Sequence, residues 1–365
     1  MSSTFHTLIL QPTTLCNLNC SYCYLCPSER RSRVEMSVDV ARAVAAGVRE
    51  QQSGHVVDVV WHGGEPLTTR REHFRDLVEA FEPLRQQGKI RHYVQTNATL
   101  IDDAWCDFLT AHDFHVGVSI DGPEIANSNR VDWSGTPVHR RIMRGVDMLR
   151  GHGIEFSAIC VATAESITDP GPLFDFFEVL GARSVGFNIE EFEGANTTRE
   201  TVDPLAVRRF WREMFERLSR GSRMRVREAD RLLGYLADVK AGRGPGWVSA
   251  PHDPIPTVGT SGDTVVLSPE LLGVRAPAYD DFIVGNVLET SLPSIVARAR
   301  EAAYVKEHFQ VVERCQRTCD FFAFCQGGQA SNRYFETGGF ATTETAYCRN
   351  AKQELVLALA ENMGV

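Results

Sequence analysis

The sequence predicts an α/β protein that contains a partial, open (β/α)6 barrel followed by a C-terminal extension. Short segments rich in β-branched residues alternate with segments of helical period along the first half of the chain. This order is typical of parallel strands that are joined by right-handed crossovers. The unusual residues of this half directly follow the strand-like segments, which is where barrel enzymes carry their active sites.

Six segments carry the strand pattern, at residues 7–11, 56–61, 91–95, 115–120, 155–162 and 184–189. Helix-like segments follow the first five of them, at residues 37–52, 71–87, 102–112, 137–152 and 170–180. Ser37 is a suitable N-cap for the first helix, in which Val40, Val44 and Val48 share one face. Because a closed barrel of this type needs eight units, we expect six units to leave the barrel open.

The pattern changes after residue 203. Helices are expected at 204–220 and 226–240, and a Gly/Pro-rich break at 242–246 indicates a module boundary. Beyond it the sequence predicts a hairpin near 263–267, a helix near 292–304 and a closing helix from residue 350. We therefore expect two units, namely residues 1–240 with the barrel and its trailing helices, and residues 241–365 as the extension.

Composition narrows the classes of function. The chain has 38 basic and 47 acidic residues and a net charge of −9, which argues against a nucleic-acid partner. No apolar run reaches the roughly 20 residues that cross a bilayer, and the N-terminus is too short and polar for a signal peptide. We expect a cytoplasmic protein without a membrane partner.

Ten cysteines divide into two groups and two single residues. Four lie within residues 16–26 and four within 315–348, whereas Cys106 and Cys160 stand alone in apolar surroundings. Without an export signal a disulfide framework is not expected, so clustered cysteines indicate metal or redox chemistry. The two single cysteines are expected to be small buried apolar residues.

The first group has the spacing Cys16-x3-Cys20-x2-Cys23. Three thiolates on one tight loop can hold three irons of a [4Fe–4S] cluster and leave the fourth iron open. The alternative is a structural zinc site, which would need Cys26 as its fourth ligand at a cramped spacing. We interpret Cys26 as an incidental loop thiol.

The loops after the next strands carry further polar motifs. The second strand is followed by Gly63-Gly64-Glu65-Pro66, the third by Gln95-Thr96-Asn97, and the fourth by Ser119-Ile120-Asp121-Gly122. The carboxyl ends of the barrel strands meet around one pocket. The sequence therefore predicts one site assembled from these loops.

These motifs, in this order, resemble the radical S-adenosylmethionine superfamily over about residues 7–191. The resemblance implies that S-adenosylmethionine chelates the open iron of the Cys16, Cys20 and Cys23 cluster. One-electron reduction would then give a 5′-deoxyadenosyl radical that abstracts a substrate hydrogen, while the protein positions and shields the reactants. The cofactor-binding residues expected from the resemblance are Tyr22, Gly63, Gly64, Glu65, Pro66, Gln95, Asn97, Ser119, Asp121 and Arg130.

Physical reasons support individual roles in that set. Glu65 would accept a hydrogen bond from the ammonium group of the cofactor, Gly63 and Gly64 would let the backbone approach the cofactor, and Pro66 would fix the turn. Asn97 and Ser119 are candidates for the ribose or carboxylate, Arg130 for the carboxylate, and Tyr22 for packing along the adenine. Arg130 could equally be a solvated surface arginine.

The second cysteine group is Cys315-x3-Cys319-x5-Cys325-x22-Cys348. It resembles the SPASM/twitch-like iron–sulfur extension of radical peptide-modifying enzymes, in which such cysteines hold an auxiliary [4Fe–4S] cluster. The ligands of the second auxiliary cluster of a full SPASM domain are missing, since no cysteine lies between 160 and 315 and position 329 is Gln329. We expect one auxiliary cluster, with a four-cysteine zinc site as the alternative.

Residues 188–194, 267–273 and 343–349 resemble the maturases of glycine-rich repeat peptides and their cyclophane-forming relatives. The resemblance implies a ribosomally made precursor peptide as substrate, and we expect a flavodoxin- or ferredoxin-type electron donor. Because six residues precede the first strand, we expect either a separate leader-peptide-binding protein or the barrel itself to bind the leader. Glu190, Glu191 and Glu193 are the candidate catalytic residues, since mutual repulsion would raise the pKa of one of them. The alternatives are a solvated acidic loop, and a small-metabolite substrate that is decarboxylated, dehydrogenated or epimerised.

Overall fold

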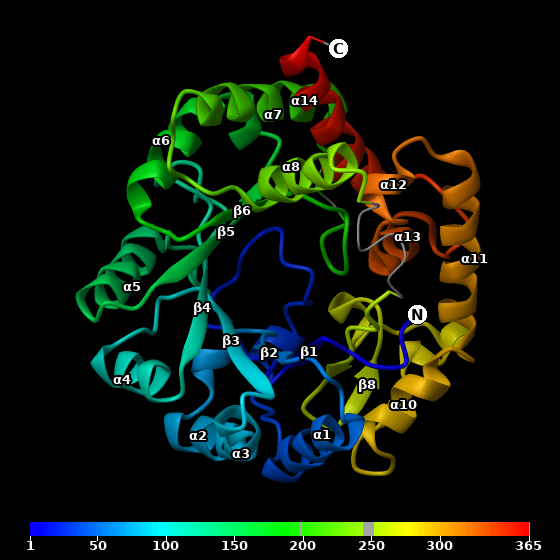
Figure 1. The fold of residues 1–365 in the computed structure, drawn as a ribbon. Helices are drawn as coiled ribbons and strands as arrows, with labels where there is room; N and C mark the ends of the chain where they lie inside the picture. Colours follow the sequence, from blue (N-terminus) through cyan, green and yellow to red (C-terminus); the bar gives the residue numbers. More distant parts are fainter. Residues whose placement is uncertain (198, 200, 244–251, 365) are drawn as a thin grey trace.

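The barrel strands form one curved parallel sheet. The structure, a computed structural model, describes residues 1–197, 199, 201–243 and 252–364. Each strand pairs in parallel with the next along the chain (Figure 1). The strands are β1 (Thr7–Leu10), β2 (Val57–Trp61), β3 (Ile90–Thr96), β4 (Phe114–Ser119), β5 (Phe156–Ala162) and β6 (Val185–Ile189). The predicted six-unit α/β barrel is confirmed.

Helices cover the outer side of this sheet (Figure 1). They are α1 (Val38–Gln51), α2 (Arg71–Glu79), α3 (Glu82–Gln86), α4 (Asp103–Ala111), α5 (His139–Gly151) and α6 (Pro170–Leu180). The Ser37 side chain accepts a hydrogen bond from the Val40 backbone nitrogen, as expected of an N-cap. The expected single helix over 71–87 is wrong, because the segment divides into α2 and α3, where Pro83 cannot donate a backbone hydrogen bond to a preceding turn.

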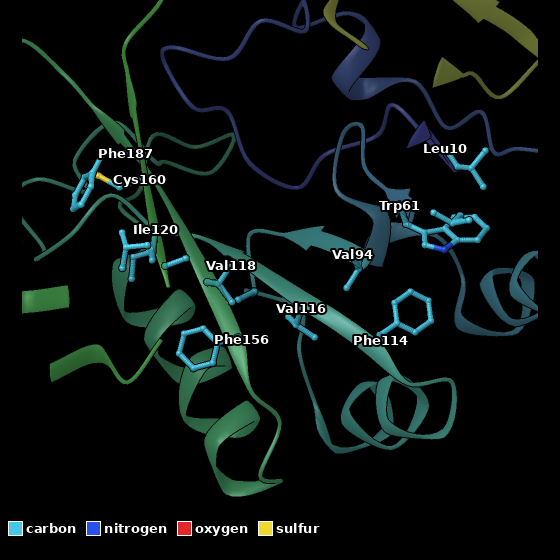
Figure 2. Packing of buried hydrophobic residues seen from close by; sticks show 14 of the residues in the cluster. Leu10, Trp61, Val94, Phe114, Val116, Val118, Ile120, Phe156, Cys160 and Phe187 are labelled. Carbon is cyan, nitrogen blue, oxygen red and sulfur yellow. The ribbon is translucent and has the colours of Figure 1, made fainter. Parts of the chain in front are cut away.

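Alternating side chains divide the strands into an outer and an inner face. In β2, β4 and β5 every second residue is buried, and these residues pack beneath the helices. Figure 2 shows part of this layer, including Trp61, Phe114 and Phe156. Cys106 and Cys160 are fully buried in the same core, as expected. The intervening residues point into the barrel, and they are therefore the side chains that can line a site.

The chain after β6 covers one end of the sheet and then forms the extension. Its helices are α7 (Pro204–Ser219), α8 (Arg227–Lys240), α10 (Leu292–Ala299), α11 (Ala303–Thr318), α12 (Phe322–Cys325), α13 (Ala330–Thr337) and α14 (Glu354–Met363). Short helical turns occur before and after β6. They lie at Glu29–Arg31, Pro66–Thr68, Ser166–Thr168, Pro269–Leu271, Pro277–Phe282 and Cys348–Gln353. The expected boundary at 242–246 lies largely outside the described residues.

The extension is attached to the barrel through the sheet itself. Strand β7 (Thr257–Val258) pairs in parallel with β1, and it pairs antiparallel with β8 (Asp263–Val265), which in turn pairs with β9 (Gly285–Asn286). The sheet therefore runs in the order β6-β5-β4-β3-β2-β1-β7-β8-β9. The expected hairpin is present, but the continuation of the barrel sheet into the extension was not predicted.

The extension helices differ from the expected pattern in one place. Instead of one helix over 292–304, α10 ends at Ala299 and a longer helix, α11, follows it. The last helix, α14, packs beside α7 (Figure 1), where Arg208 pairs with Glu354 at 2.5 Å. In the described part of the chain, none of the helices combines the length and apolar character that a membrane span requires.

Candidate active site

One cavity of about 280 Å³ lies at the carboxyl ends of the barrel strands. Most of the residues expected from the sequence line it. They are Cys16, Cys20, Tyr22, Cys23, Gly63, Gly64, Glu65, Gln95, Asn97, Ser119, Arg130, Glu190, Glu191 and Glu193. Two expected residues, Pro66 and Asp121, are buried behind this lining rather than part of it. The loops that follow different strands are thus brought together as predicted.

The two glycines bring the loop after β2 against the cysteine loop. A Cβ atom on Gly64 would lie under 3.0 Å from the carbonyl oxygens of Thr14 and Leu15, and one on Gly63 would lie 2.9 Å from that of Thr13. The backbone nitrogen of Glu65 donates to the Leu15 carbonyl at 2.8 Å. The glycines were expected to allow a close approach to the cofactor, whereas the contacts that require them here are with the protein backbone.

Glu65 is a buried carboxylate held by its neighbours. One oxygen accepts from the Thr96 hydroxyl at 2.7 Å and from the Leu67 backbone nitrogen at 3.1 Å, and the other accepts from the Asn97 backbone nitrogen at 2.7 Å. Burial raises the pKa of Glu65 to about 7, against the lowering effect of these hydrogen bonds. The side chain therefore joins the loops after β2 and β3 as well as facing the cavity.

The polar residues after β3 and β4 are also tied to the protein. The Asn97 side chain donates to the Asn17 oxygen at 2.9 Å and accepts from the Thr99 hydroxyl at 2.6 Å. Gln95 donates to the Ser119 hydroxyl at 2.8 Å across the inner face of the sheet. Asn97 thereby connects the end of β3 to the cysteine loop, a role that the motif alone did not indicate.

Arg130 is held by a buried acid on its inner side. Its Nε and Nη2 donate to the two oxygens of Asp121 at 3.0 and 2.8 Å, and its guanidinium lies 5.5 Å from the centre of the Tyr22 ring. The Tyr22 hydroxyl also donates to Asp121. Arg130 is only 6% exposed, so the alternative of a solvated surface arginine is excluded. Asp121 positions Arg130 and Tyr22, which both line the cavity.

The three thiols of the cysteine loop fit the open cluster site that the resemblance implies. Burial raises the pKa of Cys16 and Cys23, and it raises that of Cys20 to about 11. Such thiols ionise readily only with a metal bound. Cys26 does not line the cavity, and its sulfur lies 3.0 Å from the Ser28 hydroxyl instead. Cys16, Cys20 and Cys23 all line the cavity, so these three residues would hold the cluster there.

The candidate catalytic acids differ in their surroundings. Glu190 is paired through both oxygens with Arg199. Glu191 accepts a hydrogen bond at 2.6 Å from the amide of Asn332, a residue of the extension helix α13. Burial raises the pKa of Glu191 and Glu193, and nearby acidic groups raise both further. The alternative of a solvated acidic loop is therefore wrong for these two residues.

A further acid, Glu270, lines the same cavity. It belongs to the extension and adds a third carboxylate beside Glu191 and Glu193, and burial raises its pKa. Glu270 lies in the 267–273 segment, and it was not among the residues expected at the site. The sequence feature that could have identified Glu270 is its acidic side chain within the 267–273 motif, for which the sequence indicates no structural role.

The second cysteine group surrounds its own cavity of about 250 Å³ in the extension. Cys315, Cys319, Cys325 and Cys348 all line it. Cys348 and Cys325 share a hydrogen bond, which lowers the pKa of Cys325 to about 6 and raises that of Cys348.

Buried Arg333 stands 3.8 Å from the Cys315 sulfur. Across the residues that the structure describes, no three His, Cys, Asp or Glu side chains converge on one point as a single metal ion requires. Four thiols around one cavity supply the four ligands that an auxiliary [4Fe–4S] cluster needs.

A larger cavity of about 910 Å³ lies along β3–β6 and extends from the barrel interior to the amino ends of these strands. Gln95 and Ile159 line both cavities, so the two spaces adjoin. Inward-facing Tyr93, His115 and Ser157 line its wall, and Arg91 and Arg183 are among its charged residues. The interior is open because six strands do not close a barrel.

Comparison with known proteins agrees with this geometry. Residues 10–177 match the model of the radical SAM superfamily. The uncharacterized protein sll1766 of Synechocystis sp. is 33% identical over 98% of this chain and 93% of its own length. The cysteine-type anaerobic sulfatase-maturating enzyme of Clostridium perfringens (strain 13 / Type A) is 26% identical over 88% of each chain.

Two solved structures share the fold across the barrel and the extension. Native anSMEcpe with bound AdoMet and Cp18Cys peptide has a TM-score of 0.78 at 23% identity and covers 98% of both chains. Streptococcus suis SuiB bound to precursor peptide SuiA has a TM-score of 0.67 at 18% identity, covering 94% of this chain and 76% of that one. The sequence matches, together with a barrel that gathers three thiols and the Gly-Gly-Glu-Pro loop around one cavity, show that this chain is an enzyme of the radical SAM superfamily.

Proposed function

We propose that this radical SAM enzyme abstracts a hydrogen atom from a ribosomally made peptide and thereby modifies or crosslinks it. The observation that carries the proposal is the 910 Å³ interior cavity that adjoins the cofactor cavity at Gln95 and Ile159. Because this space adjoins the cofactor cavity, a peptide segment bound in it would present a side chain to the radical.

Known relatives support a peptide substrate. Two structures with the same fold across both units were solved with a bound peptide or precursor peptide. The sequence relative of Clostridium perfringens is a sulfatase-maturating enzyme, which acts on a protein. The resemblance of residues 188–194, 267–273 and 343–349 to cyclophane-forming maturases favours a crosslink as the product.

The residues around the first cavity would hold the cofactors. Cys16, Cys20 and Cys23 would bind the [4Fe–4S] cluster, which when bound supplies the electron that cleaves S-adenosylmethionine to the 5′-deoxyadenosyl radical. Glu65 and Arg130 face the space beside that loop with opposite charges, which suits the ammonium and carboxylate ends of a methionine group. The surrounding wall would keep water away from a reactive radical.

A crosslink between two carbons removes two hydrogens from the peptide. One becomes part of 5′-deoxyadenosine, and the other leaves as a proton and an electron. Glu191 suits the proton, because burial raises its pKa to about 7, and Glu193 lines the same cavity. Glu190 is committed to Arg199, so we assign it a positioning role. The electron needs an acceptor, and the auxiliary cluster proposed at Cys315, Cys319, Cys325 and Cys348 would serve.

The proposal implies further partners. A flavodoxin- or ferredoxin-type protein would deliver the electron that starts the reaction. A separate leader-binding protein would present the precursor peptide, and the reducing cytoplasm is the compartment in which both clusters would survive.

Anaerobic reconstitution tests the proposal. We expect about eight irons per chain, falling to about four when Cys16, Cys20 and Cys23 are all replaced by Ala. With dithionite, the parent should cleave S-adenosylmethionine and the triple variant should not. With a precursor peptide encoded near the gene, the product should be lighter by two hydrogen atoms.

Each outcome has a defined meaning. Loss of no iron in the triple variant would contradict the assignment of the cluster ligands. Cofactor cleavage that modifies a sugar or amino-acid derivative and leaves every peptide unchanged would favour the small-metabolite alternative.

A further inference from the structure

Three carboxylates from the barrel and the extension meet at one end of the cofactor cavity. Glu191 and Glu193 follow β6, and Glu270 lies in the extension turn Pro269–Leu271. We call these three residues the acidic end of the cavity. Within the described residues none of the three forms an ion pair, although neighbouring Glu190 does so with Arg199.

Buried acceptor atoms around the acidic end lack hydrogen-bond partners. Ser331 and Asn332 of α13 are fully buried. The Ser331 hydroxyl is in hydrogen-bonding contact with Glu193 and Glu270, whereas the Asn332 side-chain oxygen has no hydrogen-bond partner. The Asn332 amide donates to Glu191, which places its head group at the acidic end. One oxygen of Glu193 and the side-chain oxygen of cavity-lining Asn196 are unpartnered as well.

A bound cation that carries N–H groups would satisfy both the unpartnered buried acceptors and the carboxylates that lack an ion pair. Buried polar groups are normally hydrogen-bonded, and buried charges are normally paired. An ammonium offers three donors and a guanidinium five, each with a positive charge. Protons shared among the three acids would be the alternative, but they would leave the side-chain oxygens of Asn196 and Asn332 unsatisfied.

Lys352 is a positively charged side chain of the protein that lies close enough to the acidic end to affect Glu191. Its charge lowers the pKa of Glu191, while its own pKa is lowered by burial. One partly compensated acid still leaves Glu193 and Glu270 without a cation.

We propose that the acidic end binds the cationic side chain, an ammonium or guanidinium group, of a lysine or arginine in the peptide substrate. This inference rests on the proposed function and adds a specificity determinant to it. Because Glu270, Ser331 and Asn332 come from the extension, the extension would take part in selecting the substrate. S-adenosylmethionine also carries an ammonium group, so the test must separate the two sources.

The probe is N-acetyl-arginine methylamide, and its neutral counterpart is N-acetyl-citrulline methylamide. Each is titrated anaerobically into the reconstituted enzyme by calorimetry, with and without saturating S-adenosylmethionine. We expect the arginine probe to bind at least tenfold more tightly than the citrulline probe, and to do so in the cofactor-loaded enzyme. Glu270→Gln and Glu193→Gln should each weaken the arginine probe at least tenfold while leaving the citrulline probe unaffected.

Exposed Glu72 on α2 provides the matched control. Glu72→Gln removes the same charge far from the cavity and should bind the arginine probe like the parent. Thermal unfolding of each variant checks folding, and the use of two variants from separate segments guards against one that misfolds.

Three results would overturn the inference. One is equal binding of the two probes, and another is probe binding that persists unchanged in both cavity variants. The third is loss of probe binding on saturation with S-adenosylmethionine, which would assign the acidic end to the cofactor. Failure of the parent to cleave S-adenosylmethionine would instead count against the proposed function, so the two failures are distinguishable.

Discussion

The amide nitrogen of Asn97 lies 2.9 Å from the amide oxygen of Asn17 and so links the end of β3 to the cysteine loop. Asn17 also donates to the Thr99 hydroxyl at 2.8 Å, which makes the link a small network. The loop that carries the cluster ligands is therefore held by a strand two units away, in addition to its own strand β1.

Replacement of Asn97 by Ala should loosen this network. We expect a loss of about 1 to 3 kcal/mol in the free energy of unfolding, because buried partners are left unsatisfied. Iron retention should fall as well. Asn286→Ala, which removes an asparagine of β9 that bonds Ser261 and Asp263, is the control. It should lose stability without losing iron at the radical cluster, and equal iron loss in both variants would contradict the link.

Gly64→Ala should displace the Gly-Gly-Glu-Pro loop from the cysteine loop. The added Cβ would meet two carbonyl oxygens that cannot rotate away, and overpacking of this kind costs about 1 to 3 kcal/mol. Urea unfolding and iron content would measure the effect. Gly54→Ala, where no atom lies within 4 Å of the added Cβ, should behave like the parent. A Gly64 variant with full stability and iron would show that the contact is dispensable.

Asp121→Asn should be severely destabilising. Asp121 is fully buried against Arg130, and removal of one partner of a buried pair costs about 3 to 5 kcal/mol, since the other charge is left uncompensated. S-adenosylmethionine binding should weaken at the same time, because Arg130 and Tyr22 would lose their positioning. The exposed pair of Asp39 and Arg42 offers a contrast, and Asp39→Asn should change stability by less than about 1 kcal/mol.

The variants Cys348→Ser and Cys26→Ser should distinguish a cysteine that binds a cluster from one that binds no iron. Cys348 lines the extension cavity with three other thiols, so its loss should remove about four irons of the expected eight. Cys26 lies outside both cysteine-lined cavities, so the Cys26 variant should retain all eight irons. Iron counting with electron paramagnetic resonance would measure both. A zinc content of one per chain in place of the lost irons would instead support the structural zinc alternative.

The stability of the cluster-free protein should depend on Glu270 as pH changes. Burial raises the pKa of Glu270 from 4.5 to about 7, so between these values the folded state binds more protons than the unfolded state. Its contribution to stability is present below pH 4.5 and is lost as pH rises through 7. Glu270→Gln should remove about 1 to 3 kcal/mol of the decline between pH 5 and pH 8. Urea unfolding at both pH values measures this, and Glu72→Gln should keep the parental slope.

Much of this architecture was predictable from local patterns. Alternation of strand and helix segments predicted the six barrel units, and thiol spacing predicted which cysteines share a cavity. Residues such as Glu65, Gln95 and Arg130 were found because they occur in ordered motifs after strands. These signals depend on short stretches of sequence, and the geometry of a parallel barrel brings such stretches together.

Other features depend on contacts between distant segments. The pairing of β7 with β1 involves two residues in β7 and no distinctive sequence. The meeting of Glu270 and Asn332 with Glu191 requires the extension to fold back over the barrel. The helix break at Pro83 is a local feature that the apolar periodicity of residues 71–87 concealed.

The parallel pairing of β7 with β1 also determines what a shortened chain would do. The backbone nitrogens of Ile9 and Gln11 donate to the carbonyls of Pro256 and Val258 at 2.9 and 3.0 Å. A chain that ended at Lys240 would leave these donors unpaired along an exposed strand edge, and such edges recruit strands from other molecules. We therefore expect a chain that ends at Lys240 to aggregate more readily than the full chain, whether or not a cluster is bound.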